Sequence, residues 1–313
     1  MTLMLSERRI KELVGNDARG GNVFAGEQMR NHTTLRIGGP ADMYVMPDNL
    51  LSLKNLLLAF GEEGVCTMPV GGGSNLLVSD EGIEGAVISM GSLNHVEVIE
   101  ENADEVRLFA EAGTTLLKLL NLAKAEGYRG MEGLAGIPGC IGGAVRGNAG
   151  SFGFEIGNVV ESATVIRMDG KIVAAERDDL RFGYRSCAVP DGSIIVSVNV
   201  RLGKDDAKKI SRNVNEFLQE KRREQPISLL SAGCVFKNPA GTHAGRLIDE
   251  AGCKGMRRGD VEVSGLHANF FVNRGSGTAA DFLGLMEDVK ERVMKSFGVE
   301  LEPEIRIVGR RNR

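Results

Sequence analysis

The sequence lacks the features that mark membrane, secreted and zinc-binding proteins. No stretch approaches the roughly 18 consecutive apolar residues of a membrane-spanning helix. The N-terminal segment MTLMLSERRIKELVG turns charged after MTLML and contains neither an apolar signal segment nor a cleavage site, so we expect a cytoplasmic protein. The five cysteines are scattered, with no CxxC pair and no histidine at ligand spacing. This pattern argues against a metal site or a disulfide scaffold.

The chain also has fewer positively than negatively charged residues, 38 lysines and arginines against 42 aspartates and glutamates. A net charge of −4 argues against a general nucleic-acid or anionic-membrane surface, although a local basic patch could still hold a phosphate. A hydrophobic fraction of 42% and a charged fraction of 26% are typical of a soluble globular protein. The 313 residues suffice for one large domain or two ordinary ones, and we find no internal repeat.

Glycine is in excess. The chain has 42 glycines, well above the roughly 7% of an average protein. They cluster at 71–73, 127–157 and 233–277, which indicates loops that approach a ligand closely rather than a flexible linker.

Hydrophobic periodicity predicts a mixture of helices and strands. We expect helices at 49–64 (with Asp48 as N-cap), 114–128, 205–223, 244–252 and 278–298. We expect strands at 65–70, 76–80, 85–90, 161–168, 171–176, 193–202, 262–273 and 301–309, and a hairpin over 95–113. The first 90 residues are predicted to form a small α/β unit. The segment 129–157 is predicted to be an irregular loop, too glycine-rich for a helix, and loops of this length are usually functional.

Two glycine loops, GGGSN at 71–75 and GIPGCIGGAVRGNAG at 136–150, fit diphosphate binding. Backbone N–H groups can point at phosphate oxygens where no Cβ intervenes. Alone, the first loop could equally be a tight turn between strands. A third stretch, GSGTAA at 275–280, satisfies G-x-G-x-x-A between a strand and a helix. Too few residues follow it to build a dinucleotide-binding domain, so we interpret it as an ordinary helix N-terminus.

Seven motifs occur in the order found in bacterial UDP-N-acetylenolpyruvoylglucosamine reductases (the MurB family), and the chain resembles that family over about residues 30–309. They are NHTTLRIGGPADMYVMP, PVGGGSNLLVSD, GIPGCIGGAVRGNAG, RFGYRS, SAGCVFKNP, SGLHANFFVN and LEPEIRIVG. The resemblance implies an α+β protein with the vanillyl-alcohol-oxidase (PCMH) type of FAD-binding fold and a C-terminal α+β substrate-binding domain. The implied domains are an N-terminal extension (1–30), an FAD-binding domain (31–204, with subdomains 31–92 and 93–204) and a substrate-binding domain (205–313).

The resemblance also implies noncovalent FAD and NADPH as the reductant. In the family reaction a hydride passes from NADPH to FAD and then to the vinyl carbon of the enolpyruvyl ether, which gives UDP-N-acetylmuramate for peptidoglycan synthesis. Cell wall biogenesis, cell shape, the cell cycle and cell division would depend on it. The implied FAD-binding residues are Gly71, Gly72, Gly73, Ser74, Asn75, Gly136, Ile137, Gly139, Gly142, Gly143 and Ala149.

Three residues match the family's catalytic positions. Arg185 and Glu304 would stabilise charge that develops on the substrate carboxylate. Cys234, where the best-known members have serine, would protonate C2, since a thiol is a better acid than an alcohol. Without their motifs, these residues would have ordinary interpretations. Arg185 would be a solvated surface charge, and Glu304, which follows a proline, would have no special feature. Cys234 would be a small hydrophobic residue of the core.

The sequence says less about which residues bind the UDP end of the substrate. The resemblance assigns substrate binding to Tyr184, Lys237, Asn238 and Arg223. The run Lys221–Arg223 could meet a diphosphate, but such a run is ordinarily solvated and complements the helix dipole. The short connection after GYRS has no room for a tyrosine-bearing loop, so the chain resembles the shorter subclass of the family. We expect a monomer; the rival functions are a flavin oxidase of the same fold and a nonenzymatic flavin- or nucleotide-sugar-binding regulator.

Overall fold

The computed structural model describes residues 7–14, 23–190 and 192–310. The chain divides into two compact units that interleave along the sequence. Unit 1 comprises 1–25, 43–72 and 85–219, and unit 2 comprises 26–42, 73–84 and 220–313. The predicted domain boundaries near residues 30, 92 and 204 stay a prediction. The two units are groups of residues that contact one another, and such groups need not coincide with domains that fold independently.

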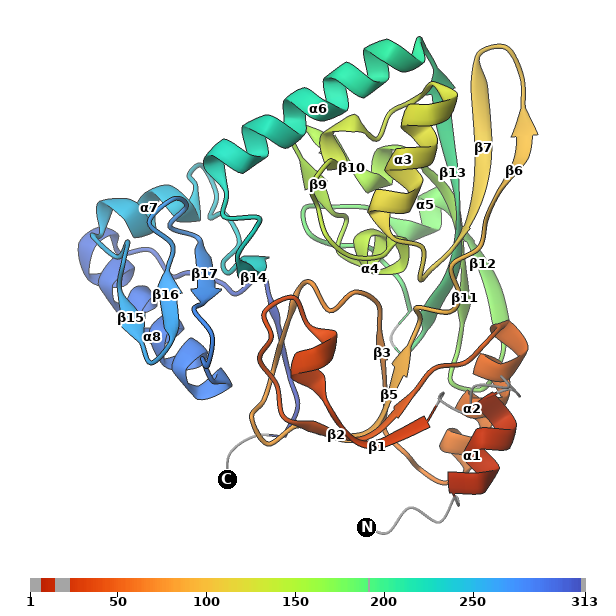
Figure 1. Ribbon diagram of the computed structural model, residues 1–313, viewed down its shortest axis with the longest axis horizontal. Coiled ribbons are helices and arrows are strands. Elements are labelled where there is room, and N and C mark those ends of the chain that lie inside the picture. Colours follow the sequence, from red (N-terminus) through yellow and green to blue (C-terminus); the bar gives the residue numbers. More distant parts are fainter. Residues whose placement is uncertain (1–6, 15–22, 191, 311–313) are drawn as a thin grey trace. The chain divides into compact units, whose positions relative to one another are not determined.

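A six-stranded antiparallel sheet forms the larger part of unit 1 (Figure 1). Its order is β12 (Ile172–Glu176), β11 (Val160–Ile166), β13 (Ile194–Lys204), β7 (Glu105–Glu111) and β6 (Val96–Glu101), and β8 (Tyr128–Arg129) also pairs with β13. The hairpin expected over 95–113 is β6–β7, and alternation along β7 buries Val106, Leu108 and Ala110. The expected hairpin is therefore confirmed, whereas β8 lies where the end of a helix and an irregular loop were expected.

Short helices accompany this sheet. They are α3 (Leu116–Glu126), α4 (Ile141–Arg146), α5 (Arg177–Leu180), η2 (Glu132–Leu134) and η3 (Ile156–Asn158), with a small ribbon of β9 (Gly150–Ser151) and β10 (Phe154–Glu155). As expected, α3 begins at a threonine cap: the Thr115 side chain accepts a hydrogen bond from the Lys118 backbone N–H. Leu119 and Val145 from these helices join Leu108 and Val198 of the sheet in one apolar core.

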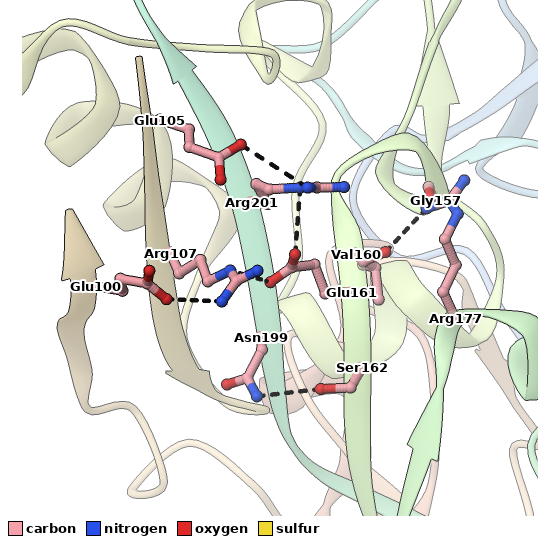
Figure 2. A network of polar contacts seen from close by, with 10 residues as sticks. All are labelled: Glu100, Glu105, Arg107, Gly157, Val160, Glu161, Ser162, Arg177, Asn199 and Arg201. Atoms are coloured by element: carbon pink, nitrogen blue, oxygen red, sulfur yellow. Dashed lines mark hydrogen bonds and ion pairs between the residues drawn. The ribbon is translucent and has the colours of Figure 1, made fainter. Parts of the chain in front are cut away.

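Polar residues of β7, β11 and β13 form an ion-pair network (Figure 2). Glu161 accepts contacts from two arginines, Arg107 at 3.1 Å and Arg201 at 3.2 Å, and Arg107 also meets Glu100 at 2.6 Å. These groups are partly exposed, and solvent screening leaves such ion pairs with little net effect on stability. The network therefore keeps this region polar and does little to stabilise the fold.

Unit 1 also contains two further helices and part of a four-stranded sheet. Its order is β1 (Val23–Gln28), β2 (Pro40–Val45), β5 (Ile83–Ser89) and β3 (Thr67–Val70). The boundary between the units falls inside β1, β2 and β5. The helices α1 (Glu7–Val14) and α2 (Leu50–Glu62) pack beside each other (Figure 1). The N-cap of α2 is Asn49 and not Asp48, because the Asn49 side chain accepts from the Ser52 backbone N–H at 2.9 Å.

Unit 2 contains a second antiparallel sheet, ordered β14 (Leu230–Cys234), β17 (Phe270–Asn273), β16 (Val261–Val263) and β15 (Arg257–Arg258). Its helices are α7 (Ala244–Glu250) and α8 (Ala279–Phe297), together with η1 (Met29–His32). Phe236, Phe271 and Phe282 are fully buried at the centre of the core. Two remote segments, β4 (Leu76–Val78) and β18 (Arg306–Val308), pair in parallel. The small α/β unit predicted for the first 90 residues is therefore wrong in one respect: β4 pairs with the C-terminal segment.

The charged helix α6 (Ala207–Glu224) connects the two units in sequence and ends just before Gln225-Pro226, as predicted. Within the described ranges no helix combines the length and the apolar character needed to cross a membrane.

Candidate active site

The two glycine loops of unit 1 lie directly against each other. A Cβ added at Gly72 would lie 3.0 Å from the Cα of Gly139, and one at Gly71 would lie 3.2 Å from the Cβ of Cys140. Gly72 therefore packs on the backbone of Gly139 and Gly71 on the side chain of Cys140, while both glycines are exposed to solvent. Bare peptide groups that are held in place in this way can bind an anion.

The second loop is not structureless, which corrects the prediction for 129–157. Gly136 and Gly139 have left-handed φ values of 74° and 112°, and the chain then turns into α4. The first two amides of α4 are anchored from outside the helix: Ile141 N–H donates to Thr114 O at 2.8 Å, and Gly142 N–H donates to Ala112 O at 2.9 Å. Tertiary hydrogen bonds thus hold a helix that its glycine content disfavours.

The remaining glycine-loop residues show two different reasons for lacking side chains. A Cβ at Gly142 would lie 2.8 Å from the Ala112 Cβ, so glycine is needed there for packing. Gly143 is exposed, and a Cβ there would meet nothing within 4 Å. Ile137 is partly buried, and the Ala149 N–H donates to Ala144 O at 2.8 Å just after α4. Among the glycines of this loop that are predicted to bind the cofactor, Gly143 is therefore the one whose missing side chain neither packing nor a left-handed φ explains.

The end of the first loop belongs to unit 2. Gly73 has a φ of 59°, and a Cβ there would collide with the carbonyl of His32, so its own chain already explains this glycine. Ser74 is partly buried. Asn75 donates from Nδ2 to the Glu304 carbonyl at 3.2 Å, and its own carbonyl accepts from Arg306 N–H at 3.0 Å. The loop GGGSN thus anchors the C-terminal segment that carries Glu304.

Cys140 follows the contact between the loops and is 7% exposed. Burial raises the pKa of its thiol, and a hydrogen bond from the Gly72 backbone opposes that rise. Since the thiolate is the reactive form of cysteine, this environment keeps Cys140 unreactive.

Arg185 lies on a tight turn in unit 1. Gly183 and Ser186 exchange two backbone hydrogen bonds, both of 3.1 Å, so Tyr184 and Arg185 are the two central residues. Arg185 has a φ of 54°, which a turn of this kind normally reserves for glycine. Its guanidinium carbon lies 5.5 Å from the centre of the Tyr184 ring, and Tyr184 is 52% exposed. A strained backbone that carries an arginine is a feature typical of functional sites.

Cys234 and Glu304 are brought into one region of unit 2, although 70 positions separate them in the sequence. Cys234 ends β14 after an irregularity at Gly233, whose φ is 80°. The next residue, Val235, accepts a hydrogen bond at its carbonyl from the Glu304 backbone N–H at 2.8 Å. The backbone segments that carry Cys234 and Glu304 are therefore held together.

The basic run at the end of α6 separates into one buried and two exposed residues. Lys221 is 2% exposed, whereas Arg222 and Arg223 are exposed. Desolvation lowers the pKa of Lys221 to about 8, and the charge of Cys234 opposes this shift. Within the basic run, Lys221 is therefore the residue coupled electrostatically to Cys234, and substrate binding by Arg223 stays a prediction.

Lys237 and Asn238 both have partners within unit 2. Lys237 forms an ion pair with Glu302, and its backbone N–H donates to the Glu302 carbonyl at 2.8 Å. Asn238 is exposed, and its Oδ1 accepts from the Ala244 N–H at 3.0 Å at the start of α7. These contacts hold the chain that follows Cys234 in a defined position.

The GSGTAA stretch is an ordinary helix N-terminus. The first backbone N–H groups of α8, those of Ala279 and Ala280, donate to the Asp80 carboxylate at 2.8 and 3.0 Å. Thr278 and Asp281 complete a capping box. The anion site at this helix end is therefore filled by the protein's own carboxylate, which agrees with our interpretation of the motif.

Among the described residues no cluster of histidine, cysteine or carboxylate side chains has the composition of a metal site. The five cysteines are free thiols.

Sequence reasoning named Lys221 only as one member of a basic run and did not single out Asn148. Lys221 continues the apolar positions Ile210, Val214 and Phe217 of α6 at helical spacing, and this pattern could have identified it as a buried charge. Asn148 is 1% exposed and has a φ of 41°, yet it is neither glycine nor part of a recognised catalytic motif. Nothing in the local sequence marks its role.

Comparison with known proteins covers both halves of the chain. Residues 41–176 match the FAD binding domain family, and residues 225–308 match the family described as UDP-N-acetylenolpyruvoylglucosamine reductase, C-terminal domain. The UDP-N-acetylenolpyruvoylglucosamine reductase of Geotalea uraniireducens is 42% identical over 289 residues, which is 92% of this chain and 95% of that protein. The protein of the same name from Desulfosudis oleivorans is 43% identical and covers 90% of this chain and 93% of its own length.

A solved structure agrees with these matches. The crystal structure of UDP-N-acetylenolpyruvylglucosamine reductase (MurB) from Thermus caldophilus has a TM-score of 0.78 and 36% sequence identity, and the likeness covers 90% of this chain and 97% of that chain.

Proposed function

The chain belongs to the UDP-N-acetylenolpyruvoylglucosamine reductase family, and from this premise we propose how its residues carry out the reaction. It is an FAD-containing oxidoreductase that uses NADPH to reduce UDP-N-acetylglucosamine enolpyruvate to UDP-N-acetylmuramate. This reaction serves peptidoglycan precursor synthesis. The rival functions, a flavin oxidase or a nonenzymatic regulator, are not favoured, since relatives of this one name match over nine tenths of the chain.

The residues of the glycine loops fit FAD. When bound, FAD supplies the hydride relay between NADPH and the substrate. Gly71 and Gly72 would present backbone to it from the first loop, and Gly143 would do so from the second, where no protein atom explains the missing side chain. The remaining residues proposed for the cofactor site are Gly73, Ser74, Asn75, Gly136, Ile137, Gly139, Gly142 and Ala149.

Arg185 and Glu304 are proposed to stabilise the negative charge that develops on the substrate carboxylate during reduction. A well-placed donor at such a position is worth about 3–4 kcal/mol. The left-handed turn of Arg185 and the backbone anchoring of Glu304 beside Val235 support these roles, because both fix the residue that carries the charge.

Cys234 is proposed to deliver the proton to C2. The observation that carries this proposal is the hydrogen bond between Glu304 N–H and Val235 O, which joins the motif of the acid to the motif of the carboxylate. Tyr184, Lys237, Asn238 and Arg223 stay proposed substrate contacts. We add Lys221, since its buried amine is electrostatically coupled to Cys234 and is suited to an anionic part of the substrate.

The cellular setting is proposed from the same membership. A UDP-linked precursor is made where nucleotides and NADPH are available, so we propose a cytoplasmic enzyme. Its product would support cell wall biogenesis and, through it, cell shape, the cell cycle and cell division. We propose that it acts as a monomer without a nucleic-acid or membrane partner.

The purified yellow protein should consume NADPH stoichiometrically with the enolpyruvyl nucleotide under anaerobic conditions. An oxidase of the same fold would need oxygen for turnover, and a regulator would bind the nucleotide without consuming NADPH. Either of these results would contradict the assigned activity.

The residue roles are tested by separating the two half-reactions. Arg185→Ala and Glu304→Gln should leave flavin reduction by NADPH nearly unchanged in stopped-flow experiments while slowing reoxidation by the enolpyruvyl nucleotide about 100-fold, as expected for loss of one charge-stabilising donor. Equal losses in both half-reactions would show that these residues do not act on the substrate carboxylate.

A further inference from the structure

The carboxamide of Asn148 is fully used in hydrogen bonds within unit 1. Nδ2 donates to Glu155 Oε2 at 2.8 Å and to the Gly183 carbonyl at 2.9 Å, and Oδ1 accepts from the Gly157 backbone N–H at 3.1 Å. These neighbours fix the orientation of the amide, because two of them are acceptors and one is a donor. An asparagine, and not an aspartate, satisfies all three.

Gly183 opens the turn that carries Arg185. Its carbonyl accepts the Ser186 N–H across the turn and the Asn148 side chain from outside, so both of its lone pairs are used. The φ of 54° at Arg185 is strained for a residue with a side chain, and strain of this kind persists only where the surroundings enforce it. Asn148 supplies part of that enforcement.

The chain opposite Asn148 is rigid as well. A Cβ at Gly157 would lie 2.8 Å from Asn148 Oδ1 and 2.7 Å from Phe182 Cγ, so glycine is required between the two. The Arg177 guanidinium donates to the carbonyls of Gly157 and Val160 (Figure 2), and it lies 6.0 Å from the centre of the Phe182 ring. Asn148 therefore connects two held segments, the loop after α4 and the RFGYRS turn.

We propose that Asn148 is a positioning residue for Arg185: through the Gly183 carbonyl it holds the left-handed turn in the conformation that presents the guanidinium to the substrate carboxylate. This inference rests on the role of Arg185 in the proposed function. It adds a link between the second glycine loop, which contains Asn148, and the group that acts on substrate.

Asn148→Asp is the most direct variant. It keeps the size of the side chain and the acceptor for Gly157, but it turns an oxygen towards the Glu155 carboxylate and the Gly183 carbonyl. Reoxidation of the reduced enzyme by the enolpyruvyl nucleotide should slow by about 10- to 100-fold, because a misplacement of about 1 Å can cost 100-fold. Reduction by NADPH should change by less than about twofold, since Arg185 does not act in that step.

Glu155→Gln is the matched control. A glutamine oxygen can still accept from Asn148 Nδ2, so this variant should reoxidise at the wild-type rate. If it slowed as much as Asn148→Asp, the negative charge of Glu155 rather than the bond from Asn148 to Gly183 would control reoxidation, and the proposal would be overturned.

A double-mutant cycle separates this proposal from the role of Arg185 itself. If Asn148 acts only through Arg185, then Asn148→Asp should have no further effect on reoxidation in an Arg185→Ala background. Equal effects in both backgrounds would overturn the positioning role. Normal reoxidation by Arg185→Ala alone would instead overturn the proposed function of Arg185, so the two failures are distinguishable.

Two further measurements guard against a merely structural effect. Calorimetry should show weaker binding of the enolpyruvyl nucleotide to Asn148→Asp, and thermal unfolding of the flavin-free protein should show whether the fold is kept. If Asn148→Asp does not fold, Asn148→Gly replaces it in the cycle, because glycine adopts a φ of 41° without strain and adds no charge. Additive losses with Asn148→Gly would likewise reject the proposal.

Discussion

The chemistry of single side chains is tested most sharply at Cys234. Cys234→Ser should keep substantial activity because a hydroxyl can still deliver a proton. Cys234→Ala should lose about 10²- to 10⁴-fold in the reoxidation half-reaction, the usual worth of a positioned general acid. Both variants should retain FAD, which separates loss of the proton donor from loss of the cofactor. Single-turnover reoxidation with product analysis measures the effect.

A thiol also brings a liability that a serine lacks. Peroxide should inactivate the wild type by oxidising the sulfur, with protection by substrate, and should spare Cys234→Ser. The four other cysteines remain in that variant and serve as the internal control. If Cys234→Ala reoxidised its flavin at the wild-type rate, Cys234 would not be the proton donor and would be an ordinary packed residue of the core.

Lys221 provides a test through the pH dependence of stability. Its pKa falls from 10.5 to about 8 because burial disfavours the ammonium. Between these values the unfolded chain binds more protons than the folded one, so this group makes stability rise as the pH increases from about 8 to 10.5. Below pH 8 both states are charged, and the burial costs roughly 3 kcal/mol. Lys221→Met should therefore raise the unfolding temperature at pH 7, and its advantage over wild type should shrink towards pH 10.

Arg222→Met, at the exposed neighbouring position, is the matched control and should leave the curve of unfolding temperature against pH unchanged. Parallel curves for wild type and Lys221→Met would contradict the lowered pKa.

Single residues were predictable where a motif marked them and unpredictable where only tertiary contacts do. Arg185, Cys234 and Glu304 could be named from RFGYRS, SAGCVFKNP and LEPEIRIVG, although their roles stay proposals. The importance of Asn148 depends on its hydrogen bonds to Gly183 and Glu155. Gly183 lies far from Asn148 in the sequence, and no motif marks Glu155 as a partner. No local pattern carries that information.

At the scale of elements, α4 allows packing and cofactor binding to be separated. Gly142→Ala should lower the stability of the flavin-free protein by about 1–3 kcal/mol, because its Cβ would press against Ala112. Gly143→Ala should leave that stability unchanged or raise it by up to about 1 kcal/mol, since alanine favours helix and the site is open. If backbone at Gly143 faces FAD, the same variant should bind FAD at least about tenfold more weakly.

Urea unfolding of the flavin-free variants and fluorescence titration with FAD give the two quantities. Unchanged FAD affinity in Gly143→Ala would remove Gly143 from the cofactor site, whatever its effect on stability.

Elements with a clear apolar period were predicted correctly, and the exceptions have physical causes. The β6–β7 hairpin, β11, β12, β13 and the helices α3, α6, α7 and α8 follow their patterns. The helix α4 was missed because its amides are anchored by the Thr114 and Ala112 carbonyls, which local composition cannot reveal. The N-cap of α2 shifted by one residue, because Asn49 rather than Asp48 reaches the Ser52 amide.

For the whole molecule, the expected α+β class with an FAD-binding part is confirmed by the element order, the matched FAD binding domain and the likeness to the solved reductase, whereas the vanillyl-alcohol-oxidase type of that part stays a prediction. The seven motifs allowed this prediction, because the fold was implied by the resemblance that they carry. The interleaving of the two units was not predictable, because it depends on pairings such as β4 with β18, whose residues lie more than 200 positions apart.

The last prediction concerns the state of the cofactor in the intact protein: FAD should be bound without a covalent link. The first glycine loop contains no histidine, and the cysteine of the second loop, Cys140, is buried with a raised thiol pKa. A protonated, shielded sulfur is a poor nucleophile towards the isoalloxazine ring. Acid precipitation of the purified protein should therefore leave the yellow colour in the supernatant, where absorbance quantifies it against the protein concentration. Colour retained in the pellet would contradict the prediction, and its loss in Cys140→Ser would then identify Cys140 as the point of attachment.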